Sequence, residues 1–275
     1  MTKFFLQFLQ FRVSPFIPKL YQKCYNTPHI MVSKEIKIVI LAAGKGKRMQ
    51  SRNPKVLSPL NGKHLIRHLL EEVEKVSQEK PIVVVGYKAE LVKKELGDTC
   101  VYVEQKEQLG TGHAVLSTQS ALAEAKNVLV LQGDMPFISS RTIKNLLERH
   151  FYSAAKVTVA TTALPDFNDW REAFMSFGRI IRKKGEILIR EYKDATPQER
   201  EIKEVNAGAY VFDAEWLWEN LEKIGNDNAQ KEYYLTDLLR IASEQKASIK
   251  TVQIDPREAL GTNTKEELEI LEKFA

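Results

Sequence analysis

Short runs of apolar, mostly β-branched residues alternate along the chain with stretches in which apolar residues recur every three or four positions. Such an alternation is typical of an α/β protein with a largely parallel sheet whose connections are helices. The predicted strands are 36–42, 81–85, 100–103, 128–131, 156–162, 208–212 and 249–254. The predicted helices are 64–76, 89–96, 113–123, 141–150, 234–244, one that Asp213 caps, and one that begins at a capping box of Thr264 and Glu267.

The pattern changes between residues 163 and 205. A turn-rich stretch over 165–178 precedes a hairpin over 179–191 that turns at Lys184 and Gly185, and a charged loop follows over 194–204. We interpret 163–205 as a lid-like subregion within one domain of residues 35–275. Residues 1–34 form a separate basic extension, which we expect to be poorly ordered.

The positive charge of the chain is concentrated near its beginning. Of the net charge of +5, four charges come from Lys3, Arg12, Lys19 and Lys23, and no acidic residue occurs among the first 30 residues. The remaining chain is close to neutral, which argues against a nucleic-acid-binding body. The basic segment is either a targeting presequence or an upstream start before a working initiator at Met31, and its composition favours the second interpretation.

Cysteine usage and hydropathy bear on where the protein works. Cys24 and Cys100 are too few for a disulfide framework and indicate a reducing compartment, so we expect a cytoplasmic protein. No apolar stretch reaches the ~18 residues that a membrane span needs, so we expect no membrane partner.

A glycine-rich segment follows the first predicted strand and can hold phosphate groups. Gly44 and Gly46 let the backbone approach phosphate oxygens, and Arg48 and Lys55 add two cations downstream. The dinucleotide fingerprint fails because Met49 stands where a glycine or alanine is needed, and the P-loop pattern is not matched either. Two cations exceed what a turn requires, so we favour a triphosphate socket over a basic solvated loop.

A second candidate position lies at the end of the fully apolar predicted strand 128–131. Asp134 follows Gly133 there, at the sheet edge where α/β proteins bind ligands. A carboxylate at this edge is a natural ligand of Mg²⁺, which prefers oxygen donors and usually takes one or two carboxylates plus substrate phosphates. The alternative is a helix cap or a turn residue.

The loop from Gln105 to Gly112 is the third candidate. A glutamine amide offers both donor and acceptor groups, which can read the edge of a pyrimidine base. Gly110 and Gly112 would let this loop pass close to a base, and the helix that begins near His113 points its N-terminus at the site. We expect His113 itself to be structural rather than catalytic.

Several short motifs occur in the order found in one enzyme family. They are L-A-A-G-x-G-x-R-M, P-K-V-L, Q-L-G-T-G-H-A, G-D-x-P, F-G-R-I, E-x-K-D-A, V-N-A-G, N-A-Q-x-E-Y-Y-L-T-D and G-x-N. Over residues 36–271 the chain thereby resembles the sugar-phosphate nucleotidyltransferases. The motifs at 108–114 and 228–237 resemble the uridyltransferase half of the bacterial bifunctional N-acetylglucosamine-1-phosphate enzymes. The resemblance implies a Rossmann-like, mixed and mostly parallel sheet with helices on both faces.

The resemblance also implies a role for each matching position. The residues implied to line the nucleotide are Leu41, Ala42, Ala43 and Gly44, and those implied to hold uracil are Gln105, Gly110 and Thr111. The implied catalytic cations are Arg48, against the triphosphate, and Lys55, between the triphosphate and the sugar phosphate. The implied ligands of Mg²⁺ are Asp134 and Asn263. The implied sugar contacts are Gly178, Glu191, Asn206, Tyr234 and Thr236.

The activity implied by the resemblance is transfer of UMP from UTP to N-acetyl-α-D-glucosamine 1-phosphate. The products would be pyrophosphate and UDP-N-acetylglucosamine, an amino-sugar precursor of cell-wall and other glycans. The attacking phosphate is already an anion and needs no general base, so positioning and electrostatics should dominate catalysis. Gln132, Met135 and Ala207 depart from the family pattern, and Ala207 bears on the exact sugar.

Other functions stay open at this point. A related nucleotidyltransferase could use glucose 1-phosphate, or CTP with an alcohol phosphate, and a non-catalytic nucleotide-sugar sensor would share the same pocket. A dehydrogenase is disfavoured by the failed dinucleotide fingerprint. The bifunctional enzymes continue into an acetyltransferase β-helix that holds a trimer together, whereas this sequence ends at Ala275. We therefore expect no acetyltransferase, and a monomer or weak oligomer.

Overall fold

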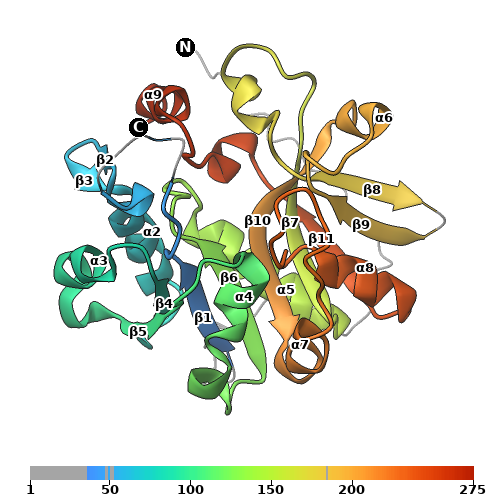
Figure 1. Ribbon diagram of the computed structural model, residues 1–275, viewed down its shortest axis with the longest axis horizontal. Coiled ribbons are helices and arrows are strands. Elements are labelled where there is room, and N and C mark those ends of the chain that lie inside the picture. Colours follow the sequence, from blue (N-terminus) through green and yellow to red (C-terminus); the bar gives the residue numbers. More distant parts are fainter. Residues whose placement is uncertain (1–35, 47–48, 50–52, 184) are drawn as a thin grey trace, which may run out of the picture. The chain divides into compact units, whose positions relative to one another are not determined.

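The computed structural model describes residues 36–46, 49, 53–183 and 185–275 (Figure 1). These residues belong to the second of two compact units, which comprises residues 34–275. The extension over residues 1–34 and the predicted site residue Arg48 lie outside the described residues, as does Lys184 of the predicted hairpin turn. The lid-like subregion over 163–205 stays a prediction.

A mixed and mostly parallel sheet forms the centre of this unit, with the strand order β11-β7-β10-β6-β1-β4-β5 (Figure 1). β10 runs antiparallel to β6 and β7, and the other neighbours on this path are parallel. The strands are β1 (Ile36–Leu41), β4 (Ile82–Val85), β5 (Val101–Glu104), β6 (Asn127–Gln132), β7 (Val157–Ala163), β10 (Glu204–Asp213) and β11 (Ile249–Gln253). The hairpin of β8 (Arg179–Lys183) and β9 (Glu186–Arg190) joins the sheet through β10, and β2 (Pro59–Leu60) pairs with β3 (Lys63–His64).

Helices cover both faces of the sheet. They are α2 (Leu65–Glu74), α3 (Ala89–Leu96), α4 (Thr111–Leu116), α5 (Ser140–Ser153), α6 (Pro197–Arg200), α7 (Ala214–Leu221), α8 (Asp237–Glu244) and α9 (Lys265–Glu272). Val39 and Leu41 of β1 belong to one apolar core with residues of α4, α7 and α8, while Ile38 and Ile40 are buried on the opposite face. Strands that are apolar on both sides, as parallel strands between two helical layers should be, confirm the predicted fold class. None of the described helices is long and apolar enough to cross a membrane.

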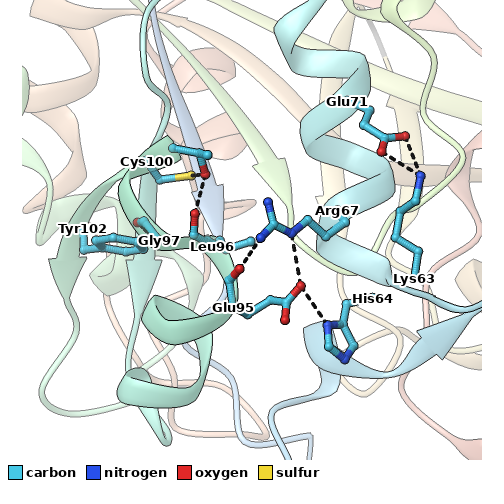
Figure 2. Close-up of polar contacts among 10 residues, drawn as sticks. Lys63, His64, Arg67, Glu71, Glu95, Leu96, Gly97, Cys100 and Tyr102 are labelled. Carbon is cyan, nitrogen blue, oxygen red and sulfur yellow. Dashed lines mark hydrogen bonds and ion pairs between the residues drawn. The ribbon is translucent and has the colours of Figure 1, made fainter.

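Ion pairs and hydrogen bonds connect the elements next to β5, the strand that precedes the Gln105 loop (Figure 2). Arg67 of α2 donates from Nε to Oε1 of Glu95 at 3.1 Å and from its guanidinium to the Glu95 carbonyl oxygen. Nδ1 of His64 lies 3.0 Å from the same carboxylate. The hydroxyl of Tyr102 in β5 donates to the carbonyl oxygen of Gly97 at 2.5 Å. These contacts tie α2, α3 and β5 together just before Gln105.

Three predicted elements differ from the structure. The predicted loop 194–204 contains helix α6, because Thr196 and Glu199 form a complete capping box around Pro197 at the first helical turn. The helix predicted over 113–123 is divided into α4 and a 3₁₀ segment, Gln119–Leu122. The helix predicted from residue 234 begins at Asp237, because the backbone before it pairs with another loop, as described below.

His150 of α5 should make folding stability depend on pH. Its ring nitrogens lie 3.0 Å from Thr158 Oγ1 and 3.2 Å from Asn127 Oδ1, and burial lowers its pKa from 6.5 to about 4. The unfolded chain takes up a proton as the pH falls through 6.5, whereas the folded protein does so only near 4, so stability is lost across this window.

We expect the free energy of unfolding to fall by about 3 kcal/mol more between pH 7 and pH 4 in the unaltered protein than in His150→Gln. Urea denaturation at a series of pH values measures this difference. Identical pH profiles for the two proteins would show that His150 is not the group responsible.

Candidate active site

The carboxyl ends of β1 and β6 and the first half of β10 gather the predicted site residues at one edge of the sheet. A cavity of about 220 Å³ lies there. The predicted residues that line it are Lys55, Thr111, Asp134, Gly178, Glu191, Asn206, Thr236 and Asn263. Tyr234 lines instead a neighbouring cavity of about 270 Å³, which shares Glu191 with the first.

The other described site residues that were predicted, Leu41, Ala42, Ala43, Gly44, Gln105 and Gly110, do not line this cavity. Leu41 ends β1, and Ala42 and Ala43 continue from it as buried residues before Gly44, which is exposed. Gln105 and Gly110 belong to the loop that ends at Thr111, which does line the cavity.

The glycine-rich segment folds back over Lys55. The carbonyl oxygen of Ala43 accepts from the backbone N–H of Tyr87 at 3.1 Å, which ties the start of the segment to the end of β4. Gly46 has φ +60°, and a Cβ atom at this position would lie 2.9 Å from Cβ of Lys55. Glycine is therefore required at position 46 both for its backbone conformation and for its approach to Lys55.

Lys55 links the two predicted metal ligands. Its Nζ lies 2.6 Å from Oδ2 of Asp134 and 3.0 Å from Oδ1 of Asn263, so two oxygens from distant parts of the chain converge on one cation. Asp134 is only 6% exposed, and a carboxylate buried to this degree needs a cationic partner.

The same two oxygens fit a divalent cation. A carboxylate and an amide oxygen are donors that Mg²⁺ accepts, and Mg²⁺ commonly completes its shell with water and substrate phosphates. No cluster of three or more His, Cys, Asp or Glu that could hold a metal occurs among the described residues.

The start of α9 positions Asn263. Thr264 caps the helix by accepting from the backbone N–H of Glu267 at 3.2 Å, as the predicted capping box requires. The Glu267 carboxylate, however, accepts from the backbone N–H of Asn263, one residue before the position that a capping box would use. This half of the prediction was wrong, and the displaced contact fixes the backbone of a predicted metal ligand.

A bulge in β10 turns Asn206 toward the cavity. The pairing of β10 with β7 shifts between Asn206 and Tyr210, and Gly208 between them has φ +76°. Oδ1 of Asn206 accepts from the backbone N–H of Gly208 at 3.0 Å, and Nδ2 donates to Tyr210 Oη at 2.6 Å. The amide is thereby fixed. Sequence reasoning missed Tyr210, whose signal was a hydroxyl-bearing residue in an otherwise apolar predicted strand.

Glu191 is a half-buried acid that lines the cavity. Its Oε1 accepts from Thr236 Oγ1 at 2.9 Å. Burial raises its pKa, and the nearby carboxylates of Asp194 and Asp237 raise it further. A Cβ atom at Gly178 would lie 2.8 Å from Cγ2 of Ile189 and 3.4 Å from Glu191 Oε1, so glycine at this position leaves room for the Ile189 side chain beside the acid.

The loop before α4 pairs with the backbone before α8. The backbone N–H of Tyr233 donates to the Leu109 carbonyl oxygen at 2.8 Å, and the N–H of Gly112 donates to the Tyr233 carbonyl oxygen at 2.8 Å. The N–H of Leu235 donates to Thr111 Oγ1 at 3.0 Å. These bonds join the loop implied to hold uracil to the motif at 228–237.

Gly110 is where this pairing should be most sensitive to substitution. It has φ +115°, and a Cβ atom would lie 2.6 Å from the Tyr233 carbonyl oxygen. We expect Gly110→Ala to lower the free energy of unfolding by roughly 2–4 kcal/mol, because strain and a backbone clash add. Gly62→Ala is the matched control, since Gly62 has φ +76° and open space around it. Equal losses in the two variants, measured by chemical denaturation, would exclude a role for the Tyr233 contact.

Comparison with known proteins places the chain in a family. The model of the MobA-like NTP transferase domain family matches residues 38–188. The Bifunctional protein GlmU of Bacillus licheniformis is 42% identical over 229 residues, covering 82% of this chain and 49% of that protein. The protein of the same name from Streptococcus mutans is 43% identical over 241 residues, covering 86% and 50%. That from Desulfotalea psychrophila is 41% identical over 237 residues, covering 84% and 68%. The chain thus spans about half the length of the first two.

Two solved structures share the fold. A UDP-glucose pyrophosphorylase complexed with UDP-glucose superposes with a TM-score of 0.68 at 21% identity, covering 86% of this chain and 97% of that one. A putative glucose-1-phosphate thymidylyltransferase from Bacillus anthracis superposes with a TM-score of 0.68 at 17% identity, covering 87% and 95%.

A mostly parallel sheet with a glycine-rich loop after its first strand, and with ligand-binding side chains at its carboxyl edge, is the architecture of a nucleotide-binding enzyme. The chain belongs to the MobA-like NTP transferase domain family and is a nucleotidyltransferase.

Proposed function

We propose that this protein transfers UMP from UTP to N-acetyl-α-D-glucosamine 1-phosphate and releases pyrophosphate. The observation that carries the proposal is the cavity in which Lys55, Asp134 and Asn263 lie beside Glu191 and Asn206. It combines a cation centre suited to phosphates with a polar wall suited to a sugar. The similarity to proteins named GlmU supports the same assignment.

The nucleotide would lie along the loop after β1, against residues 41–44, with its base at the loop of Gln105, Gly110 and Thr111. The amino sugar would contact Gly178, Asn206 and the Glu191–Thr236 pair. Tyr234 lines the neighbouring cavity together with Glu191, so it would affect the sugar through Glu191 rather than by direct contact.

Mg²⁺ would be held by Asp134 and Asn263, and when bound it neutralises charge on the phosphates and orients them. Lys55 now pairs with both of these oxygens, and two cations at contact distance repel each other strongly in a partly buried site. Lys55 would therefore turn from Asp134 and Asn263 to the phosphates that enter with the metal.

The reaction needs no proton transfer from this chain. An oxygen of the sugar phosphate forms a bond to the α-phosphorus, and the bond from that phosphorus to the bridging oxygen breaks, so pyrophosphate leaves with the electron pair. Lys55 would neutralise charge that develops on these oxygens, and the fixed amide of Asn206 and the carboxyl group of Glu191 would hold the attacking substrate in place.

Release of pyrophosphate from UTP in the presence of Mg²⁺ tests the proposal, with N-acetylglucosamine 1-phosphate and glucose 1-phosphate offered in parallel. We expect a strong preference for the acetylated sugar. Preference for glucose 1-phosphate would move the sugar assignment and keep the reaction. Binding of UTP without turnover on either sugar would favour a nucleotide-sugar sensor.

A further inference from the structure

We propose that His113 is a positioning residue that makes the site select a pyrimidine base carrying an N3–H group, and so uracil over cytosine. The inference rests on the proposed UMP transfer and deepens it. It assigns base selection partly to a side chain that would not touch the nucleotide and that sequence reasoning took to be structural.

The Gln105 amide has one orientation that satisfies its neighbours. Gln105 is 3% exposed, and its Nε2 lies 3.1 Å from the Gly110 carbonyl oxygen and 3.0 Å from His113 Nδ1. A backbone carbonyl can only accept, so the atom that faces Gly110 is the amide nitrogen. The second N–H of that nitrogen then donates to His113, whose Nδ1 is the unprotonated ring nitrogen.

This orientation leaves the amide oxygen of Gln105 available to a ligand. Both N–H groups of the Gln105 amide are used, and none of the described residues donates to its oxygen, Oε1. Because Oε1 is not one of the described buried atoms that lack a hydrogen-bond partner, it is accessible enough to accept from a donor on a ligand. The side chain of Gln105 is thus presented as an acceptor and not as a donor.

The loop that carries Gln105 lies near the glycine-rich segment after β1. Gln108 Nε2 donates to the backbone carbonyl oxygen of Gln105 at 2.9 Å. A Cβ atom at Gly86 would lie 2.8 Å from this Nε2 and 3.0 Å from Cβ of Ala43. The loop that carries Gln105 therefore packs beside Ala43, at the start of the glycine-rich segment.

Pyrimidine bases differ in what they present to such an acceptor. Uracil has a hydrogen on N3 and can donate it to Oε1 of Gln105, and thymine offers the same group. Cytosine has a lone pair on N3, which would face the lone pairs of Oε1. A site built to accept a hydrogen bond discriminates against a partner that cannot donate one, because the bound base then covers the acceptor and leaves it unpaired.

His113 strengthens this orientation because it is the second of only two acceptors described for the amide. Without His113, one N–H of the Gln105 amide has no partner in the observed orientation. The free-energy difference between the observed amide and the flipped amide therefore becomes smaller. The contact with Gly110 would remain. We therefore expect loss of His113 to weaken selection without inverting it.

The experiment compares UTP and CTP binding by calorimetry, and kcat/KM for the two nucleotides, in His113→Leu and His113→Asn. We expect His113→Leu to lower the preference for UTP over CTP by about tenfold. His113→Asn should restore most of the preference, because its Oδ1 can take the place of Nδ1 as acceptor. His113→Ala repeats the test with a smaller side chain if the melting temperature of His113→Leu is low.

A purely structural role for His113 predicts that both nucleotides weaken together, and an unchanged ratio in His113→Leu and His113→Ala would overturn the inference. Equal binding of UTP and CTP by the unaltered protein would also overturn it, while leaving nucleotidyl transfer in place. Absence of binding to either nucleotide would overturn both the inference and the proposed function.

Discussion

Lys55→Ala is expected to lower the turnover number by about 10²–10³-fold, the size typical of losing one charge contact to a transition state. Lys55 is the described cation that lines the cavity beside Asp134 and Asn263, and the loop carrying Gly46 closes over it. Pyrophosphate release at saturating UTP and sugar phosphate measures the effect. Lys63→Ala is the matched control, because Lys63 pairs with Glu71 on an exposed surface and does not line the cavity.

We also expect Mg²⁺ to affect the thermal stability of Lys55→Ala. Removal of Lys55 leaves the carboxylate of Asp134, 6% exposed, without the cation that now pairs with it. We expect a lower melting temperature for Lys55→Ala, and a larger rise on adding millimolar Mg²⁺ than the unaltered protein shows. Near-normal turnover, or no difference in the response to Mg²⁺, would contradict the place given to Lys55.

Asp134→Asn is expected to cost about 10³-fold in turnover under the same conditions, because the charged ligand for Mg²⁺ and the partner of Lys55 are lost together. Asparagine keeps the shape and one oxygen, so the variant tests the charge. Raising the Mg²⁺ concentration should recover part of the activity, since weaker metal binding can be offset by mass action.

Asp213→Asn is the matched control for Asp134→Asn. Asp213 caps α7 by accepting from the backbone N–H of Trp216 at 2.9 Å, and asparagine caps a helix equally well. We expect its turnover to be unchanged. If Asp134→Asn were as active as Asp213→Asn, Asp134 would have no part in the reaction.

The strands and long helices could be predicted because each carries its own periodic signal. The apolar run 128–131 is β6, with four fully buried residues between two helical layers. The start of α8 could not be read in the same way. Residues 234–236 continue the helical pattern in sequence, but the backbone of Tyr233 and Leu235 is used to pair with residues 109–112. A long-range contact thus overrides local propensity there.

The place of one candidate site residue in the fold could also be predicted from the sequence. The position of Asp134 follows from the rule that ligands bind at the carboxyl ends of parallel strands, whereas Asn263 rested on motif order alone. The partners of Asn206 and Gln105 could not be predicted, because they depend on a bulge in β10 and on a turn that brings Gly110 and His113 to one amide. The two cavities that separate Tyr234 from Thr236 likewise exist only in three dimensions.

The backbone bonds between residues 109–112 and 233–235 have a consequence for how such enzymes can be altered. One segment carries the residues proposed for the base, and the other belongs to the motif proposed for the sugar, so hydrogen bonds link the two proposed subsites directly. A chimera that takes residues 228–237 from a relative specific for another sugar would pair them with a segment 109–112 that does not match them. We therefore expect the preferred substrate to change successfully only when residues 109–112 and 228–237 are replaced together.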